Sequence, residues 1–282
     1  MTTIVAYALR EAVRRKVFLV VLVLTLIFLG LDALANHYIF RDVNGIRVPA
    51  DAHVDSRTFA GAFVVGMSMF ATLFLGVVLA VFLTLGAVSG DAERGLLQPL
   101  VVRPIGRGSL LVARFLAAAG VCAVYVFVVY LIAVVITGAE GEYWPDAIVS
   151  PGLLLAGAVA LMTALSLLGS VFLGGTANGI AIFMLFIAGL VAGLLGTIGH
   201  ALNSHTISHA ATIAAWVLPF EALYQDALQQ ITQSTHGFTG FLLRLGPFGG
   251  AYNGGWGVRL WAAAFLVLVG TAAIAAFRRR DL

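Results

Sequence analysis

Lysine and cysteine are almost absent from this sequence. The only lysine is Lys16, so the chain contains no phosphate-binding loop of the form G-x-x-x-x-G-K-[ST] and cannot bind ATP in that manner. The motifs H-E-x-x-H and G-x-S-x-G, which mark metalloproteases and serine hydrolases, are absent as well. The single cysteine, Cys122, lies in an apolar run, so no intrachain disulfide can form. We therefore expect no catalytic residue and no cofactor in this chain, so that any energy comes from a partner or an ion gradient.

Charged residues are also scarce. Asp, Glu, Lys and Arg make up 10% of the 282 residues, against about a quarter in soluble proteins. Three stretches, 58–90, 115–139 and 147–220, contain none of these four residue types. Because the hydrocarbon core of a bilayer is roughly 30 Å thick, apolar runs of about 20 residues are typical of transmembrane helices. The sequence therefore predicts an all-α integral membrane protein rather than a large soluble core.

Six transmembrane helices are expected in a single domain that covers residues 1–282. They are predicted at 17–35, within 59–88, at about 110–137, at 151–173, at 179–199 and at 256–277. The break between the fourth and fifth is placed at 174–179, and the run 206–218 is too short for a further span. Asp32 is expected near the outer end of the first helix, where a carboxylate reaches the interface at little cost; a substrate contact is the alternative.

Two segments beside the first span have patterns of their own. Residues 1–16 carry an apolar stripe opposite basic residues, which is typical of a helix lying on the membrane surface; a plain cytoplasmic extension is the alternative. Residues 36–57 are expected to form an extracytoplasmic loop. Within this loop, 38–49 predict a β-hairpin, because Asn44-Gly45 suits a two-residue turn in which both residues need a positive φ.

The outer region 200–255 is expected to contain helical structure before the last span. The half-polar stretch 219–231 begins with Pro219, a favoured first-turn residue, and predicts a short helix in or dipping into the interface. Three histidines precede it, two of them one helical turn apart. We expect no metal there, because no cysteine or nearby carboxylate completes a copper or zinc ligand set. These histidines are His200, His205 and His209.

Cations and tryptophans predict how the helices cross the membrane. Of the 16 Lys and Arg residues, 11 lie before the first span, around the connection after the second span, or after the last span, which six crossings place on one side. The positive-inside rule assigns this side to the cytoplasm. All four tryptophans fall near the opposite edge, as in an outer aromatic belt. We expect cytoplasmic termini in the cell membrane, and this orientation explains the basic charge better than nucleic-acid binding.

One charged segment, 89–109, separates the second and third predicted spans and is expected to lie in water beside the membrane. Its sequence Asp91-Ala-Glu-Arg-Gly-Leu-Leu-Gln-Pro-Leu100, followed by Arg103-Pro-Ile-Gly-Arg107 and Arg114, resembles the acidic–Arg–Gly–Thr–Leu … Arg–Pro–x–x–Arg … Lys segment of ABC-2 type permeases. These are membrane subunits of ATP-binding-cassette (ABC) exporters. The predicted layout of the whole chain is similar to theirs too. Leu96 stands in place of the usual threonine, and Pro99 interrupts the short helix of the segment.

This resemblance implies that 89–109 forms a coupling helix that docks on a separate ABC ATPase subunit. That partner would hold ATP and Mg, while a second permease copy or a paralogue would complete the pathway among the membrane lipids. Three leucines can form an apolar anchor and the charged residues a polar rim. In the alternative, the charges only orient the chain. The residues assigned to coupling are Asp91, Glu93, Arg94, Gly95, Leu96, Leu97, Leu100, Arg103, Pro104 and Arg107.

The resemblance also implies outward transport driven by ATP hydrolysis on the partner. An ion-coupled carrier is disfavoured, because such carriers keep ionisable groups at mid-membrane and we expect none away from the span ends. A mechanotransmitter or maturation subunit without a small-molecule cargo is a further alternative. In favour of a maturation subunit, the segment 218–224 resembles a proline-containing segment of permeases, some of which act in copper-site maturation.

An aromatic and methionine stripe on the second span is the candidate substrate pathway. Such side chains recur there at helical spacing and adapt to varied apolar ligands. Packing against lipid or against neighbouring helices is the alternative. The stripe consists of Phe63, Met67, Phe70 and Phe74.

Overall fold

The protein is described by a computed structural model, which places residues 16–43, 55–85, 107–232 and 255–279. These residues form helices and no strand. The helices are α2 (Lys16–Arg41), α3 (Ser56–Thr84), α6 (Arg107–Gly141), α7 (Val149–Phe172), α8 (Gly175–Ala201), α9 (His205–Val217), α10 (Pro219–Thr232) and α12 (Gly255–Arg279). Six of them, all except α9 and α10, are long and apolar enough to cross a membrane. The all-α fold and the six predicted spans are therefore confirmed.

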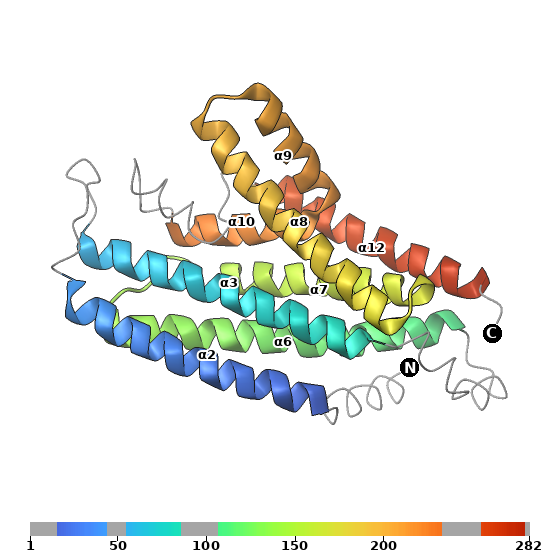
Figure 1. Cartoon of the computed structure of the whole chain (residues 1–282), viewed down its shortest axis with the longest axis horizontal. Helices are drawn as coiled ribbons and strands as arrows, with labels where there is room; N and C mark the ends of the chain where they lie inside the picture. Colours follow the sequence, from blue (N-terminus) through green and yellow to red (C-terminus); the bar gives the residue numbers. More distant parts are fainter. Residues whose placement is uncertain (1–15, 44–54, 86–106, 233–254, 280–282) are drawn as a thin grey trace.

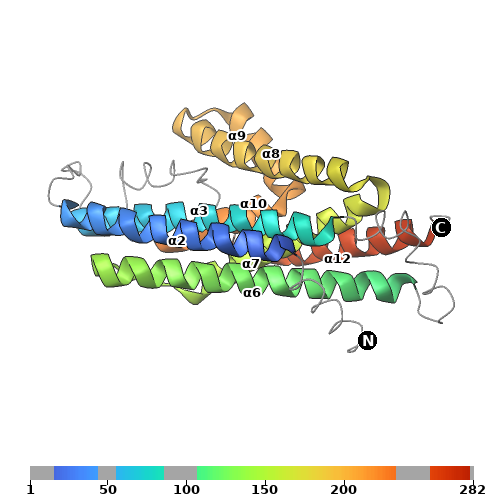
Figure 2. The ribbon, with the colours of Figure 1, turned by 60° about the horizontal axis from the view of Figure 1, so that its bottom comes forward.

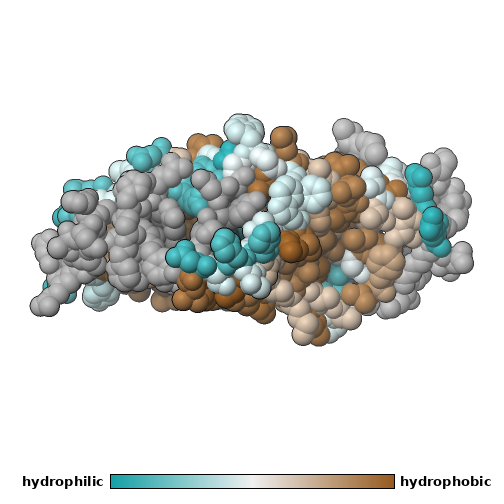
Figure 3. All heavy atoms as spheres, turned by 90° about the horizontal axis from the view of Figure 1, so that it is seen from above, coloured by the Kyte–Doolittle hydropathy of each residue, from teal (hydrophilic) through white to brown (hydrophobic). Residues whose placement is uncertain are grey.

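The spans are arranged around α3 and α7. These two helices, with α2, α6 and α12, run along the long axis of the molecule, whereas α8 and α9 form a hairpin that leans away from it (Figures 1 and 2). In the most apolar 18-residue stretch of α3 and of α7, 72% of the residues are buried within the chain, against 17% in α2. Figure 3 shows an apolar band across the middle of the molecule, with polar side chains on either side of it. This band is the surface that a bilayer would cover.

The first span is longer than the sequence suggested. Helix α2 continues to Arg41, so 38–41 are helical and the predicted β-hairpin is wrong for these residues; its remainder, 44–49, lies outside the described residues. The side chain of Asn36 donates a hydrogen bond to the carbonyl of Asp32 (2.8 Å) within the helix. Phe40 then packs its ring directly over Gly141 of α6. Packing along α6 has therefore overridden the strand preference of the aromatic and β-branched residues.

The turn between α7 and α8 is also tighter than predicted. The expected break at 174–179 is confined to Leu173 and Gly174, because α8 begins at Gly175. The Asn178 side chain donates to the carbonyl of Ser166 on α7 at 2.9 Å, which ties the first turn of α8 back onto the preceding helix.

Helix α10 confirms the predicted short helix before the last span, but it lies deep in the bundle rather than at its rim. It packs against α7, α12, α3, α8 and α9. Every described side chain from Pro219 to Leu228 is buried, including three polar ones. Those polar side chains are Glu221, Gln225 and Asp226.

Candidate functional site

The predicted coupling segment leaves and re-enters the described chain at one end of the bundle. Residues 86–106 lie outside the described residues, so the coupling prediction for them stays a prediction. They connect the end of α3 to the start of α6, and Arg107 is the first residue of α6. A Cβ atom at Gly108 would lie 3.2 Å from Ile274 and 3.6 Å from Arg278 of α12. Helix α6 thus begins beside the basic C-terminal turn of the last span (Figure 1).

The opposite end of the bundle carries acidic and aromatic groups. His37 of α2 lies 3.4 Å from Glu140 of α6, and Arg57 of α3 donates to Glu142 at 2.9 Å. Both pairs are largely exposed, so each contributes at most about 1 kcal/mol to stability. Cationic helix ends on one side and mixed, aromatic connections on the other match the charge asymmetry on which the predicted orientation depends.

The stripe on α3 forms the uncovered side of an otherwise buried helix. Phe63, Met67 and Phe74 are 40%, 43% and 42% exposed, while Phe70 is half-buried. Phe74 also contacts two rings of α8, those of Phe183 and Phe186, at centroid distances of 6.5 and 6.2 Å. The stripe therefore lies along the side of α3 that turns toward α8, where large apolar side chains are available to a partner, a substrate or lipid.

Asp32 was predicted to reach the interface, but it lies inside the bundle. It lies nine residues before the end of α2, about 14 Å at 1.5 Å per residue, and is only 7% exposed. The Ser68 hydroxyl of α3 lies 2.5 Å from Asp32 Oδ1, and the Asn36 amide lies 3.4 Å from Oδ2. The prediction was wrong because α2 continues to Arg41, so that Asp32 lies well inside the helix, where α2 packs against α3.

A second buried carboxyl group lies on α10. Glu221 is 2% exposed, and its Oε1 accepts a hydrogen bond from Gln225 Nε2 at 3.0 Å. Burial raises the pKa of Glu221 to about 8, and the Gln225 hydrogen bond offsets part of this rise. One turn further on, Asp226 accepts from Arg259 of α12 at 2.8 Å, so that this carboxylate has a cation beside it. The sequence showed the charges of α10 but not that its neighbours would enclose them.

The C-terminal end of α10 shows how deep in the bundle Glu221 lies. The hydroxyl of Tyr143, just beyond α6, donates to the carbonyl of Ile231 at 3.2 Å. Burial raises the pKa of Tyr143 to about 12, so this hydroxyl keeps its proton. Ten residues of helix, about 15 Å, separate Glu221 from that anchor. This is about half of the 30 Å hydrocarbon core, so Glu221 lies near the middle of the bundle although α10 itself is not one of the six spans.

Histidines do not assemble a metal site in the described part of the chain. His205 and His209 are exposed on α9, and no group of three histidine, cysteine or carboxylate residues is close enough to hold an ion there.

The family of the chain follows from a comparison with protein families. The family model described as "ABC-2 family transporter protein" matches residues 2–282. The chain belongs to this ABC-2 transporter family. No curated protein matches it. Together with the six apolar helices, membership makes the chain a multi-pass membrane protein and an ABC permease, and it implies pairing with an ABC ATPase subunit. The predicted resemblance is thus confirmed.

Proposed function

We propose that this ABC-2 permease is the membrane subunit of an exporter, which moves its substrate outward while a separate subunit hydrolyses ATP. The observation that carries the proposal is the family match over nearly the whole chain. The fold supports it, since the start of α6, which follows the predicted coupling segment, lies beside the basic end of α12. ATP and Mg would bind only to the partner, and this chain would have no catalytic residue of its own.

The coupling residues of this proposal lie in the segment from Asp91 to Arg107. Leu96, Leu97 and Leu100 would fill an apolar groove on the ATPase subunit while the charged residues pair around it. Force applied there reaches α3 and α6 directly, because the segment joins these two helices. Since α3 is among the most buried spans, its displacement must shift its neighbours as well.

The pathway of this proposal would run along the uncovered stripe of α3. A second copy of the chain, or a paralogue, would face Phe63, Met67 and Phe74 across it. Side chains of this kind accommodate apolar substrates of varied shape. Contact with lipid is the alternative role of the same surface. Polar substitutions at Met67 distinguish a pathway from a lipid contact, because they change substrate-stimulated ATPase activity only if the stripe borders the pathway.

A charge reversal in the coupling segment tests the proposal. The double variant Glu93→Arg, Arg94→Glu is expected to insert normally, because the segment lies outside the spans, but to lose the coupling between ATP hydrolysis and transport. The matched control Arg57→Glu, Glu142→Arg exchanges an exposed pair at the other end of the bundle and is expected to leave coupling unchanged. Transport would be measured in liposomes containing the permease and its ATPase at equal expression.

The same liposomes separate the alternatives. Wild-type transport by the Glu93/Arg94 variant would refute the coupling assignment. Uptake driven by an ion gradient without ATP would indicate a carrier, for which Asp32 provides an ionisable group whose burial the sequence did not reveal. ATP hydrolysis that no substrate stimulates would indicate a mechanotransmitter.

A further inference from the structure

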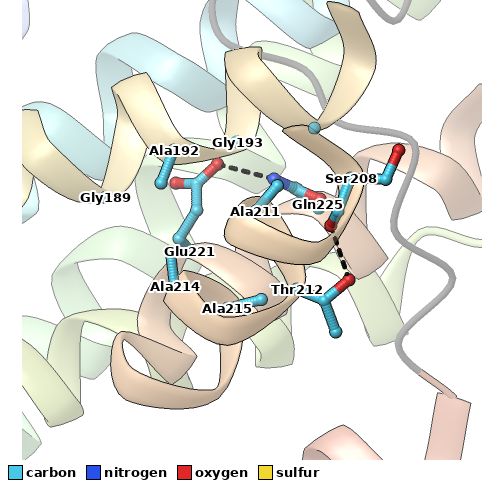
Figure 4. A pocket seen from close by; sticks show the side chains of 11 residues that line it. Gly189, Ala192, Gly193, Ser208, Ala211, Thr212, Ala214, Ala215, Glu221 and Gln225 are labelled. Carbon is cyan, nitrogen blue, oxygen red and sulfur yellow. Dashed lines mark hydrogen bonds between the residues drawn. The ribbon is translucent and has the colours of Figure 1, made fainter. Parts of the chain in front are cut away.

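A small cavity lies where the α8–α9 hairpin meets α10. Its volume is about 20 Å³, enough for one water-sized particle. Figure 4 shows Glu221 and Gln225 pointing into it from α10, with Ser208 and Thr212 on the α9 side. The α8 wall consists of small residues, Gly189, Ala192, Gly193 and Gly196. The site is therefore polar on two sides and has room for the carboxyl group only because its third side lacks bulk.

The carboxyl group of Glu221 is half satisfied. Its Oε1 accepts from Gln225, whereas its Oε2 is buried and has no hydrogen-bond partner among the residues that the structure describes. Gly193 lies directly against this carboxyl group, and a Cβ atom there would collide with it and with the Gln225 amide. An unpaired oxygen in such a position is far more costly for an ionised carboxylate, which needs several donors, than for a neutral acid.

No cation faces Glu221 within the described parts of the neighbouring helices. Helix α7 has no titratable residue, and the only charged residue of α3, Arg57, pairs with Glu142. On α12, Arg259 pairs with Asp226, which is the nearest acidic residue on α10 itself; Tyr224 is buried beside Glu221 and stays neutral because burial raises its pKa. Helix α9 contributes two histidines, both exposed, and α8 has only His200 near its end. The basic side chains that the structure describes on these helices are therefore already paired or at the surface.

From this geometry we infer that Glu221 is a proton-binding site that joins α10 to the α8–α9 hairpin. With the proton bound, the neutral carboxyl group lies against Gly193 and the hairpin stays closed over the cavity. With the proton released, the carboxylate draws water into the cavity and the hairpin moves away from α10. The proton passes between Glu221 Oε2 and water, so no other reactant is required.

The α8–α9 hairpin is the element that is free to respond. None of the residues of α9 is buried; α9 packs mainly on α8 and α10, and its last turn touches α12. The Thr212 hydroxyl donates a hydrogen bond to the carbonyl of Ser208 at 2.9 Å and not to Glu221. The bulky contacts of α9 lie at its last turn, where the Trp216 ring packs at a tilt against Trp261 of α12 (5.7 Å between centroids) and Trp261 Nε1 donates to the Trp216 carbonyl at 2.7 Å. Around the cavity itself, α8 and α9 present only glycine, alanine, serine and threonine side chains, whereas Phe186 of α8 stacks on Phe220 of α10 beside it. The hairpin can therefore open at the cavity by pivoting on these aromatic contacts, which lets a single proton influence it.

A distance measurement across the hairpin tests the inference without requiring transport. The only cysteine, Cys122, is buried and can be replaced by alanine, after which Ala210→Cys on α9 and Val124→Cys on α6, both at exposed positions, take spin labels. In detergent between pH 5 and 10, the distance is expected to increase with pH along a one-proton titration. Glu221→Gln, which imitates the neutral acid, should hold the short distance at every pH, while Glu140→Gln at an exposed site should behave as the parent.

Two further measurements keep the test decisive. Gln225→Leu removes the donor that favours the ionised carboxyl group, so the titration midpoint should move to higher pH; a purely structural role would leave the midpoint unchanged. Between the ordinary value of 4.5 and about 8, the native state binds more protons than the unfolded state, so the thermal stability of the parent should fall with rising pH relative to Glu221→Gln. A distance independent of pH, an unchanged titration in Glu221→Gln, or a midpoint that depends on sodium concentration would overturn the inference.

Discussion

Replacing Gly76 by alanine probes the contact at which three spans meet. Gly76 of α3 faces Val126 of α6 and Val159 of α7, both fully buried. A Cβ atom at this position would lie far inside the van der Waals radius of the Val126 methyl group and 3.0 Å from a methyl group of Val159. Both valines have a stiff χ1 angle, so neither can rotate away without a backbone shift.

The size of the effect follows from two opposing terms. Overpacking of a well-packed core costs about 1–3 kcal/mol, and two rigid neighbours place Gly76 in the upper part of this range. Alanine gains about 1 kcal/mol over glycine within a helix. We therefore expect Gly76→Ala to lower the free energy of unfolding by about 1–2 kcal/mol, even though alanine is the better helix former.

Unfolding of the purified protein in mixed micelles, followed by circular dichroism, measures this change. Gly120→Ala on the exposed face of α6, where nothing lies within 4 Å of the new Cβ, is the matched control and should be stabilised slightly. Adding Val126→Ala to Gly76→Ala should recover part of the loss, since the two sites are in contact. Equal stability of Gly76→Ala and Gly120→Ala would refute the close approach of α3 to α6 and α7.

Two further pairs of substitutions test the buried polar groups by the same unfolding measurement. Ser68→Ala removes the closest partner of Asp32 and should lower the free energy of unfolding by about 1–3 kcal/mol. Thr72→Val, one turn away, removes a hydroxyl that has no hydrogen-bond partner in the described structure and should be neutral or stabilising. Similar losses in both variants would contradict the Asp32–Ser68 contact. Arg259→Gln leaves the buried Asp226 without its cation and should cost about 3 kcal/mol, much of which Asp226→Asn should restore in the double variant.

The number and positions of the spans could be predicted because they depend on the composition of single segments. A run such as 115–139, with no charge over 25 residues, has no stable place in water, whatever surrounds it. The family resemblance was likewise carried by the local order of residues from Asp91 to Arg107. Segment ends were less predictable: α2 extends to Arg41 because of a contact with α6, and Tyr38 to Arg41 by themselves resemble a strand.

The environment of each ionisable side chain was decided only by the tertiary structure. Asp32 and Glu221 look alike in the sequence, as single acids at the edges of apolar runs, and either could have reached water. Their fate depends on residues distant in the chain, Ser68 for the first and Gly193 for the second, which only helix packing brings near them. The sequence by itself thus determined that this permease lies in a membrane, since hydrophobicity is a property of each segment. Which of its carboxyl groups lie inside the bundle was determined by packing, because burial is a property of neighbours.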